Sequence, residues 1–267
     1  MLTEVKNTLK FLFLSLIYNI KASMEYKKSF IIQVIFMIVN NGFFLIFWIV
    51  VFDINNGDVN GIQMNDILYL WSIPVASWGL ANFMFGGVRE INKYVLTGGL
   101  DTYLLQPKNM ILNIATSKCD FGACGDLIYG LVLGWIACGG NFFQYIRVLF
   151  YIFIATIISV DSFILIRILS IWIGEVDKIA HIYENSLFIT FSTYPFEIFG
   201  GFIKFMMFTV VPAAYVSYIP IKLLNKFDLK IFLILIFATV LYSAIAIKVF
   251  YKSLEKYESG NNIAMKE

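Results

Sequence analysis

The stretch REINKYVLTGGLDTYLLQP, residues 89–107, is polar but lies between two long apolar runs. It contains a helical pattern, a stop, a restart and a second stop. Gly98 and Gly99 favour the left-handed turn that ends a helix. Asp101 is placed to cap a short second helix, which Pro107 closes. The stretch therefore predicts a helix-turn-helix that docks a partner on the inner side of a membrane.

The predicted docking surface combines a glycine turn, a capping acid, an apolar knob and a charged rim. Its members are Arg89, Glu90, Lys93, Gly98, Gly99, Leu100, Asp101, Tyr103 and Leu104. Leu100, Tyr103 and Leu104 are expected to form the exposed knob, and the charged residues are expected to surround it. The alternative is a loop that merely packs on its own membrane domain.

The composition identifies an integral membrane protein. Of 267 residues, 60% are hydrophobic and 14% are charged, against roughly 45–50% and about 25% in soluble domains. This length allows one membrane domain and leaves no room for a further soluble domain. The net charge of +2, with no basic and aromatic cluster, gives no indication of nucleic-acid binding. The three cysteines are expected to be buried free thiols.

The apolar runs predict an all-α protein with six transmembrane helices. The predicted spans are 30–52, 67–88, 121–140, 148–173, 179–199 and 231–250. Residues 1–29 include an amphipathic run that is too short to cross a bilayer, which needs about 20 residues. That run predicts an interfacial helix on the inner leaflet.

Residues 201–224 are apolar but lie among several helix breakers, including Pro212 and Pro220. A single uninterrupted helix is not expected in a segment with so many helix breakers. We expect two re-entrant half-helices, near 201–210 and 213–224, before the last span. Irregular backbone at membrane depth is tolerated where it is buried in protein or lines a cavity. The alternative is a single span at 195–217.

Polar residues inside the predicted spans and half-helices are the candidates for a polar path through the membrane or for a subunit interface. They are Asn40, Asn41, Asp161 and Lys204. A charge at the bilayer centre is costly and should face protein or water. For Asp161 the structural interpretation is a partner such as Lys204 or an amide on another span. The functional interpretation is a polar lining of a path through the membrane or a charge contact with a second membrane subunit.

Two glycines, Gly130 and Gly134, have the GxxxG spacing that permits close helix contact. Packing within the chain and packing between subunits are both compatible with this motif, and packing within the chain is favoured. The motif therefore predicts that the third span approaches another helix closely.

Positive charge predicts the orientation of the chain. Lysines and arginines gather before the first span, in and after the 89–107 stretch, and in the C-terminal tail, whereas the 53–66 loop has none. Both termini and the 89–107 stretch are thus expected in the cytoplasm. Lys222, Lys226 and Lys230 would lie outside, against the rule.

The sequence contains no pattern that indicates catalysis or metal binding. LTGGLD at 96–101 only superficially resembles the signature of an ABC ATPase, because no phosphate-binding GxxxxGK[ST] loop is present. The only histidine, His181, lies near Glu184 and is interpreted as a solvated interfacial residue. No catalytic residue, metal ligand or cofactor is therefore assigned.

Four segments, in the same order, resemble the permease subunits of bacterial type-2 ABC exporters. They are VLTGGLDTYLLQP (95–107), YPFEIF (194–199), VVPAAYVSYIP (210–220) and VFYKSLEKYESG (249–260). The resemblance is to the subfamily often encoded as two adjacent permeases with one ATPase. It implies an interfacial helix before the first span, a coupling helix that rests on the ATPase, and half-helices before the last span. The family usually has Arg or Lys before the loop's proline, whereas this chain has Gln106.

The resemblance implies the membrane permease of an ATP-driven exporter in the bacterial plasma membrane. Its expected partners are a dimer of ABC ATPase subunits, which would bind ATP and Mg²⁺, and a second identical or related permease. The loop would pass the motion of the ATPase to the first and second spans. The many aromatic residues suit an amphiphilic or hydrophobic substrate. One rival is an ion-coupled secondary transporter using Asp161, which inverted repeats would support. Another is a membrane-embedded enzyme.

Overall fold

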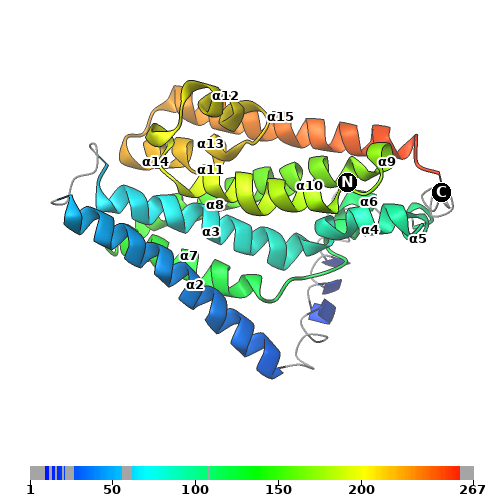
Figure 1. Ribbon diagram of the computed structural model, residues 1–267, viewed down its shortest axis with the longest axis horizontal. Helices are drawn as coiled ribbons and strands as arrows, with labels where there is room; N and C mark the ends of the chain where they lie inside the picture. Colours follow the sequence, from blue (N-terminus) through cyan, green and yellow to red (C-terminus); the bar gives the residue numbers. More distant parts are fainter. Residues whose placement is uncertain are drawn as a thin grey trace.

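The structure, a computed structural model, describes residues 10–11, 14–15, 17–19, 21, 27–55, 62–106 and 109–258. All elements in this part of the chain are helices (Figure 1). Long helices run roughly side by side, and several short helices gather at the ends of the bundle. The predicted all-α membrane class is confirmed. The interfacial helix predicted at 1–29 falls largely outside the described residues.

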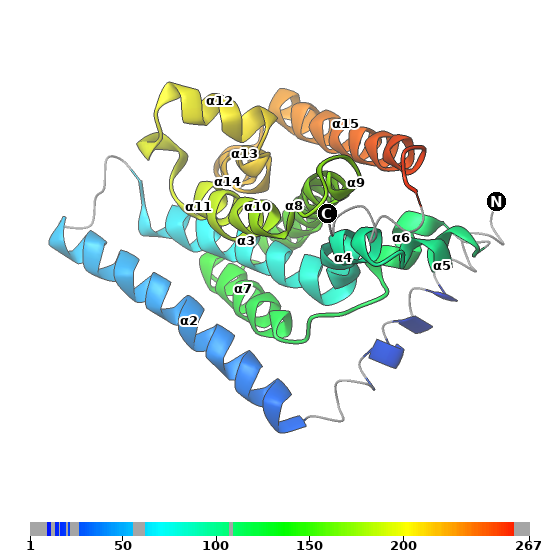
Figure 2. The ribbon, with the colours of Figure 1, turned by 45° about the vertical axis from the view of Figure 1, so that its right-hand side comes forward.

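The first half of the described chain contains two long helices, a chain of short ones and a medium helix. They are α2 (Lys27–Ile54), α3 (Met64–Phe85), the 3-10 helix η2 (Gly86–Glu90), α4 (Ile91–Leu96), α5 (Leu100–Leu104), α6 (Met110–Ala115) and α7 (Ala123–Ala137). Helix α3 packs most closely on α7, and α2 packs chiefly on α7. Figure 2 shows α2 running along the outer side of the bundle.

The second half has two more long helices with an irregular region between them. Its elements are α8 (Phe142–Ile168), α9 (Ser170–Ile173), α10 (Asp177–Ile182), the π-helix η3 (Tyr183–Phe188), α11 (Ile189–Thr193), the 3-10 helix η4 (Phe196–Ile198), α12 (Gly201–Thr209), α13 (Ala213–Val216), α14 (Tyr218–Asn225) and α15 (Leu229–Leu254). Helix α8 lies in the middle of the bundle and packs on both α3 and α15.

By length and composition, four helices of the described chain can cross a membrane, or five if one bent pair counts as a span. The four include α2, α3 with its continuation to Leu96, α8 with α9, and α15. Helix α7 has 15 residues, fewer than the roughly 20 that span a bilayer. Within the predicted span 179–199 the helix is continuous only as far as Thr193, and the short 3-10 helix η4 follows after a break. The count of six therefore stays a prediction.

The segment before α15 is broken near the predicted position. Helix α12 and the helical pair α13–α14 are bent by 73° at a short break that contains Pro212. Proline has no N–H to donate, so a helix cannot continue through it undisturbed. A single continuous helix over 195–217 is therefore wrong. The bent pair fits either a broken span or a re-entrant pair.

Small residues let α3 and α7 approach closely. A Cβ added at Gly130 would lie 2.6 Å from the Ala76 nitrogen, and one at Gly134 would lie 2.8 Å from the Ser72 hydroxyl. From the α3 side, a Cβ at Gly79 would lie 2.4 Å from the Leu127 nitrogen. The GxxxG pair thus packs within the chain, as the favoured interpretation predicted.

Candidate functional site

The predicted helix-turn-helix is present at one end of the bundle, where α4 and α5 lie beside α6 (Figure 1). Gly98 turns the chain with a φ of +73°, a conformation in which a side chain is strained. Val95 on α4 is buried, and Leu100 on α5 is fully buried. We call α4, the turn and α5 the coupling loop. Its two helices are held by the core of the membrane domain.

Asp101 does not cap α5, contrary to the prediction. The helix begins two residues earlier than expected, with Gly99 at the N-cap and no side-chain capping bond. Asp101 lies in the first helical turn, where a carboxylate still interacts favourably with the helix dipole. The sequence correctly indicated a restart here but not its first residue.

The exposed apolar tip is also composed differently from the prediction. Leu100 is buried and cannot belong to an exposed knob. Tyr103 is half-buried, with its ring centroid 5.2 Å from that of Tyr94, and burial raises the pKa of Tyr103 to about 12. The exposed apolar side chains are Leu104, 50% exposed, and Leu105, 86% exposed. Leu105 was missed because the prediction took the face of Leu100, Tyr103 and Leu104 as the exposed one, whereas Leu100 faces the core.

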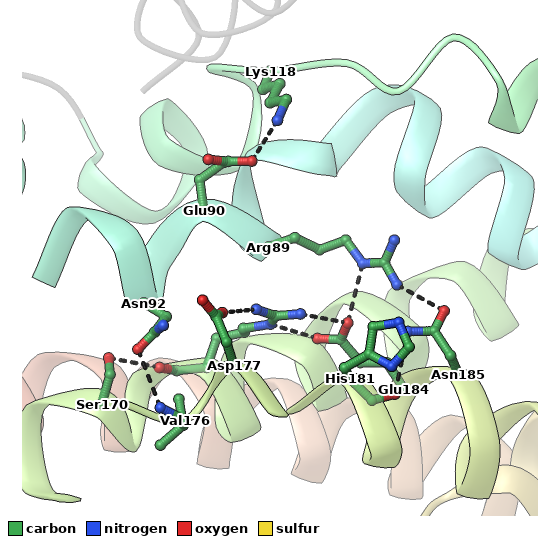
Figure 3. Close-up of polar contacts among 11 residues, drawn as sticks. Arg89, Glu90, Asn92, Lys118, Ser170, Val176, Asp177, His181, Glu184 and Asn185 are labelled. Atoms are coloured by element: carbon green, nitrogen blue, oxygen red, sulfur yellow. Dashed lines mark hydrogen bonds and ion pairs between the residues drawn. The ribbon is translucent and has the colours of Figure 1, made fainter. Parts of the chain in front are cut away.

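The predicted charged rim divides into two parts. Lys93 is exposed, and Glu90 forms an ion pair with the exposed Lys118. Arg89 instead points into the protein, away from the Glu90–Lys118 pair (Figure 3). Its place in a rim around the knob is therefore a wrong prediction. In the 3-10 helix η2, consecutive residues point in widely different directions, so Arg89 and Glu90 cannot share a face.

Arg89 belongs to a charge cluster, which we define as Arg89, Arg167, Asp177 and Glu184 (Figure 3). Arg167 donates to both carboxylate oxygens of Glu184, at 2.7 and 2.8 Å, and to Asp177 at 2.7 Å. Arg89 donates to Glu184 at 3.1 Å and to the Asn185 side chain at 3.2 Å. Two cations and two carboxylates make the cluster electrically balanced. Charged side chains can be buried when each is paired with an opposite charge, especially where two parallel hydrogen bonds join a guanidinium to a carboxylate.

The charge cluster joins elements that are distant in the sequence. Arg89 comes from η2, at the base of the coupling loop, Arg167 from the end of α8, and Glu184 from the π-helix η3. The Glu184 side chain is fully buried. His181, which the sequence analysis interpreted as a solvated residue, is exposed, whereas the nearby Glu184 is buried. A π-helical turn often marks a functional site, and here it presents Glu184 to both arginines.

The end of α15 is fastened close to the coupling loop. The Trp172 indole of α9 donates to the Ser253 hydroxyl at 2.8 Å, and the Lys256 ammonium lies 3.8 Å from the centroid of that indole ring. Burial, and then the Asp101 carboxylate, raise the pKa of Tyr257 to about 12. The tail after α15 thus meets α5 and α9 at the same end of the bundle.

The four polar residues expected inside the membrane do not share one location. Asn41 is buried and donates to Asp126 of α7 at 2.6 Å, whereas Asn40 is exposed. Asp161 accepts from the Ser243 hydroxyl of α15 at 2.5 Å. The prediction that Lys204 pairs with Asp161 is wrong, because the Lys204 ammonium lies 5.0 Å from the ring centroid of Phe196. A hydroxyl, not a cation, satisfies Asp161.

A cavity of about 250 Å³ lies between α2, α3 and the η3–α11 segment; we call it the α2–α3 cavity. Its polar lining includes Asn40, Asn41, Asp126, Asn185, Ser192 and Thr193, and its aromatic lining includes Trp71 and Trp78. Asp126 was missed by the sequence analysis. The available signal was an acidic residue inside the apolar run 121–140, which by default marks a functional position.

The described residues contain no group of three or more His, Cys, Asp or Glu side chains that could hold a metal ion. Cys119 and Cys138 are buried free thiols, and Cys124 is half-buried. In this part of the chain, no His or Cys side chain lines the α2–α3 cavity or belongs to the charge cluster.

Comparison with known proteins gives one match. The family model described as ABC-2 family transporter protein matches residues 36–261. No curated protein and no solved structure matches. The matched range covers most of the chain and includes the coupling loop, the charge cluster and the α2–α3 cavity.

Proposed function

The chain belongs to the ABC-2 family of transporter proteins, and from this premise we propose that it is the permease subunit of an ATP-driven exporter. The chain forms the membrane path for an amphiphilic or hydrophobic substrate. A separate pair of ABC ATPase subunits binds and hydrolyses ATP, and a second identical or related permease completes the path.

One observation carries this proposal: the coupling loop is rigidly held, yet its tip is exposed and apolar. Leu100 and Val95 anchor α5 and α4 in the core, while Leu104 and Leu105 project from the same loop. Exposed leucines at the end of a membrane domain are costly in water unless a partner covers them. A groove on an ATPase subunit is a partner of suitable shape for two short helices.

The contacts of the coupling loop indicate how its movement reaches the membrane. Helix α4 packs on α8 and α9, and η2 packs on α3 and α8. Arg89 then joins the base of the loop to Glu184 in η3. The motion would pass to α3, α8 and the α10–α11 segment. The expectation that it passes to the first span is not supported, since α2 packs chiefly on α7.

We place the coupling loop and both termini in the cytoplasm of a bacterial cell, with the spans in the plasma membrane. The distribution of lysine and arginine supports this orientation. The gathering of α4, α5, α6, α9 and the end of α15 at one end of the bundle agrees with it (Figure 1). The orientation and the coupling role stand together, because ATP is hydrolysed on the cytoplasmic side.

The rival proposal, ion-coupled transport through Asp161, has weaker support. Asp161 lies between α8 and α15, where Ser243 donates to it, and it does not line the α2–α3 cavity. A polar group paired across two helices in this way serves helix association. The coupling loop has no role in that rival mechanism.

The test is to place a charge on the exposed tip. Leu105→Asp, in permease co-expressed with its ATPase, should reduce the ATPase that co-purifies by about tenfold, because a desolvated interface rejects an unpaired carboxylate. Insertion and thermal stability should stay at wild-type levels, since Leu105 is 86% exposed. The matched control is Phe227→Asp, an apolar residue 56% exposed before α15, which should retain the ATPase. Full retention by Leu105→Asp would refute the coupling assignment and, with it, the orientation.

A further inference from the structure

The α2–α3 cavity places one carboxylate among amides and tryptophans. Asp126 is 8% exposed and lines the cavity. Its recorded partner is the Asn41 side-chain amide, at 2.6 Å, and Asn41 also donates to the Met37 carbonyl at 2.9 Å. The amide thus holds the carboxylate in place without neutralising its charge.

No cation of the described residues neutralises Asp126. The ion pairs in this part of the chain use Arg89, Lys118 and Arg167, and their acidic partners are Glu90, Asp177 and Glu184. Arg89 lies beside the cavity, because its guanidinium is 5.0 Å from the ring centroid of the lining residue Trp78. It is already engaged by Glu184 and Asn185. The charge of Asp126 is therefore available for a ligand.

The aromatic side of the cavity favours the same kind of ligand. Trp71 and Trp78 line it, and Phe44 stacks on Trp71 with ring centroids 3.5 Å apart. Indole rings attract cations through their electron-rich faces, as the position of Arg89 over Trp78 illustrates. A carboxylate and two tryptophans in the lining of one cavity form an arrangement that can recognise an ammonium group.

The position of the cavity indicates where such a ligand comes from. Helix α2, which forms one wall, has only 11% of its most apolar stretch buried in the protein. Asn40 lines the cavity and is exposed on that helix. Because α2 is long and apolar enough to cross a membrane, its exposed face meets lipid. A ligand that enters beside α2 therefore needs an apolar part that partitions into the bilayer.

We propose that the α2–α3 cavity binds the ammonium head group of a single-chain cationic amphiphile, with Asp126 as its counter-ion and the tail lying along α2. About 250 Å³ is below the volume of a drug-sized site and suits a head group rather than a whole amphiphile. This inference rests on the proposed function, because it names the class of molecule that the exporter would carry.

The test measures binding of dodecyltrimethylammonium to the full chain in phosphatidylcholine nanodiscs, without ATPase. The wild-type chain should bind radiolabelled probe saturably, and dodecanol, which has the same tail and no charge, should not displace it. Asp126→Asn should weaken binding about tenfold or more, because it removes the counter-ion and keeps the shape. Asp161→Asn is the matched control: it changes another buried membrane carboxylate, one that does not line the cavity, and should bind within about twofold of wild type.

A second variant keeps the test decisive if Asp126→Asn does not fold. Asn40→Trp retains the carboxylate and fills the cavity from an exposed position, so it should likewise weaken binding about tenfold or more. Wild-type affinity in either folded variant, or equal displacement by dodecanol, would overturn the proposal. Failure of the head-group proposal would not change the co-purification of the ATPase with the permease. Failure of the coupling assignment, in turn, would not prevent measurement of probe binding to the cavity.

Discussion

The long apolar helices of this protein form two pairs with opposite surroundings. In each long helix we compare the fraction of its most apolar stretch that is buried inside the protein. This fraction is 72% for the helix Met64–Leu96 and 61% for Phe142–Ile173. The corresponding values are 11% for Lys27–Ile54 and 22% for Leu229–Leu254. The central helix α3 buries serines, Asn82 and Gly79, while the outer helix α2 exposes isoleucine, valine and phenylalanine.

The difference teaches what holds a membrane domain together. Lipid is as apolar as leucine, so apolar side chains gain little by moving from lipid to protein. Small residues that allow close backbone contact, and polar groups that find partners, decide which helices lie inside. Substitutions at three places test this statement: the charge cluster, the glycines of α3 and α7, and the contact of Asp161 with Ser243. The expected loss in free energy of unfolding decreases in that order.

The largest effect is expected at the charge cluster. Glu184→Ala removes the carboxylate that holds both Arg167 and Arg89. The buried Arg167 then keeps only the half-exposed Asp177 as a partner, which should cost about 3–5 kcal/mol in free energy of unfolding. Thermal unfolding of the purified protein measures it. Asp177→Asn is the control, because the Asp177 side chain is 56% exposed and should contribute less than about 1 kcal/mol. Equal losses would mean that burial of the cluster is unimportant.

An intermediate effect is expected from one added methyl group. Gly130→Ala would bring a Cβ to 2.6 Å from the Ala76 nitrogen on α3 and should destabilise the protein by about 1–3 kcal/mol through overpacking. Gly42→Ala on the outer helix meets nothing within 4 Å and should be neutral or stabilise by up to about 1 kcal/mol. The same thermal assay compares them. A tolerated Gly130→Ala would show that α7 is not closely packed on α3.

The smallest effect is expected where α15 meets α8. Ser243→Ala removes the hydroxyl that donates to Asp161 and should cost about 0.6 kcal/mol, the mean for a hydrogen bond between membrane helices. Thr239→Val is the control, because the Thr239 hydroxyl donates to Leu235 within its own helix.

Asp161→Asn keeps an acceptor for Ser243 and should leave export unchanged. Loss of export with normal stability would instead favour the ion-coupled mechanism.

The sequence allowed much of the fold and part of the site to be predicted. The run of polar residues at 89–107 indicated the coupling loop, and Gly98 has the positive φ expected of it. The breakers near Pro212 indicated the bent pair, and the GxxxG spacing indicated close packing. These predictions succeed because they depend on local chemistry: backbone conformation at glycine, the missing N–H of proline, and the absence of a side chain.

The predictions that failed concerned partners and directions. Arg89 was assigned to the rim of the loop, yet it points inward to Glu184, which is 95 residues away. Leu100 was assigned to the exposed knob, yet it is fully buried. A shift of one residue turns a side chain by about 100° in an α-helix such as α5 and by about 120° in a 3-10 helix such as η2. Spacing alone could not decide which side of each helix faces the protein.

The sequence by itself determined that this chain crosses a membrane, where its helices break, and to which family it belongs, because hydropathy, prolines, glycines and ordered motifs are properties of the chain. Only the tertiary structure decided that Asp126 lies beside Asn41, that Ser243 rather than Lys204 satisfies Asp161, and that two arginines enclose Glu184. A buried polar group needs some partner, and helix packing selects which one.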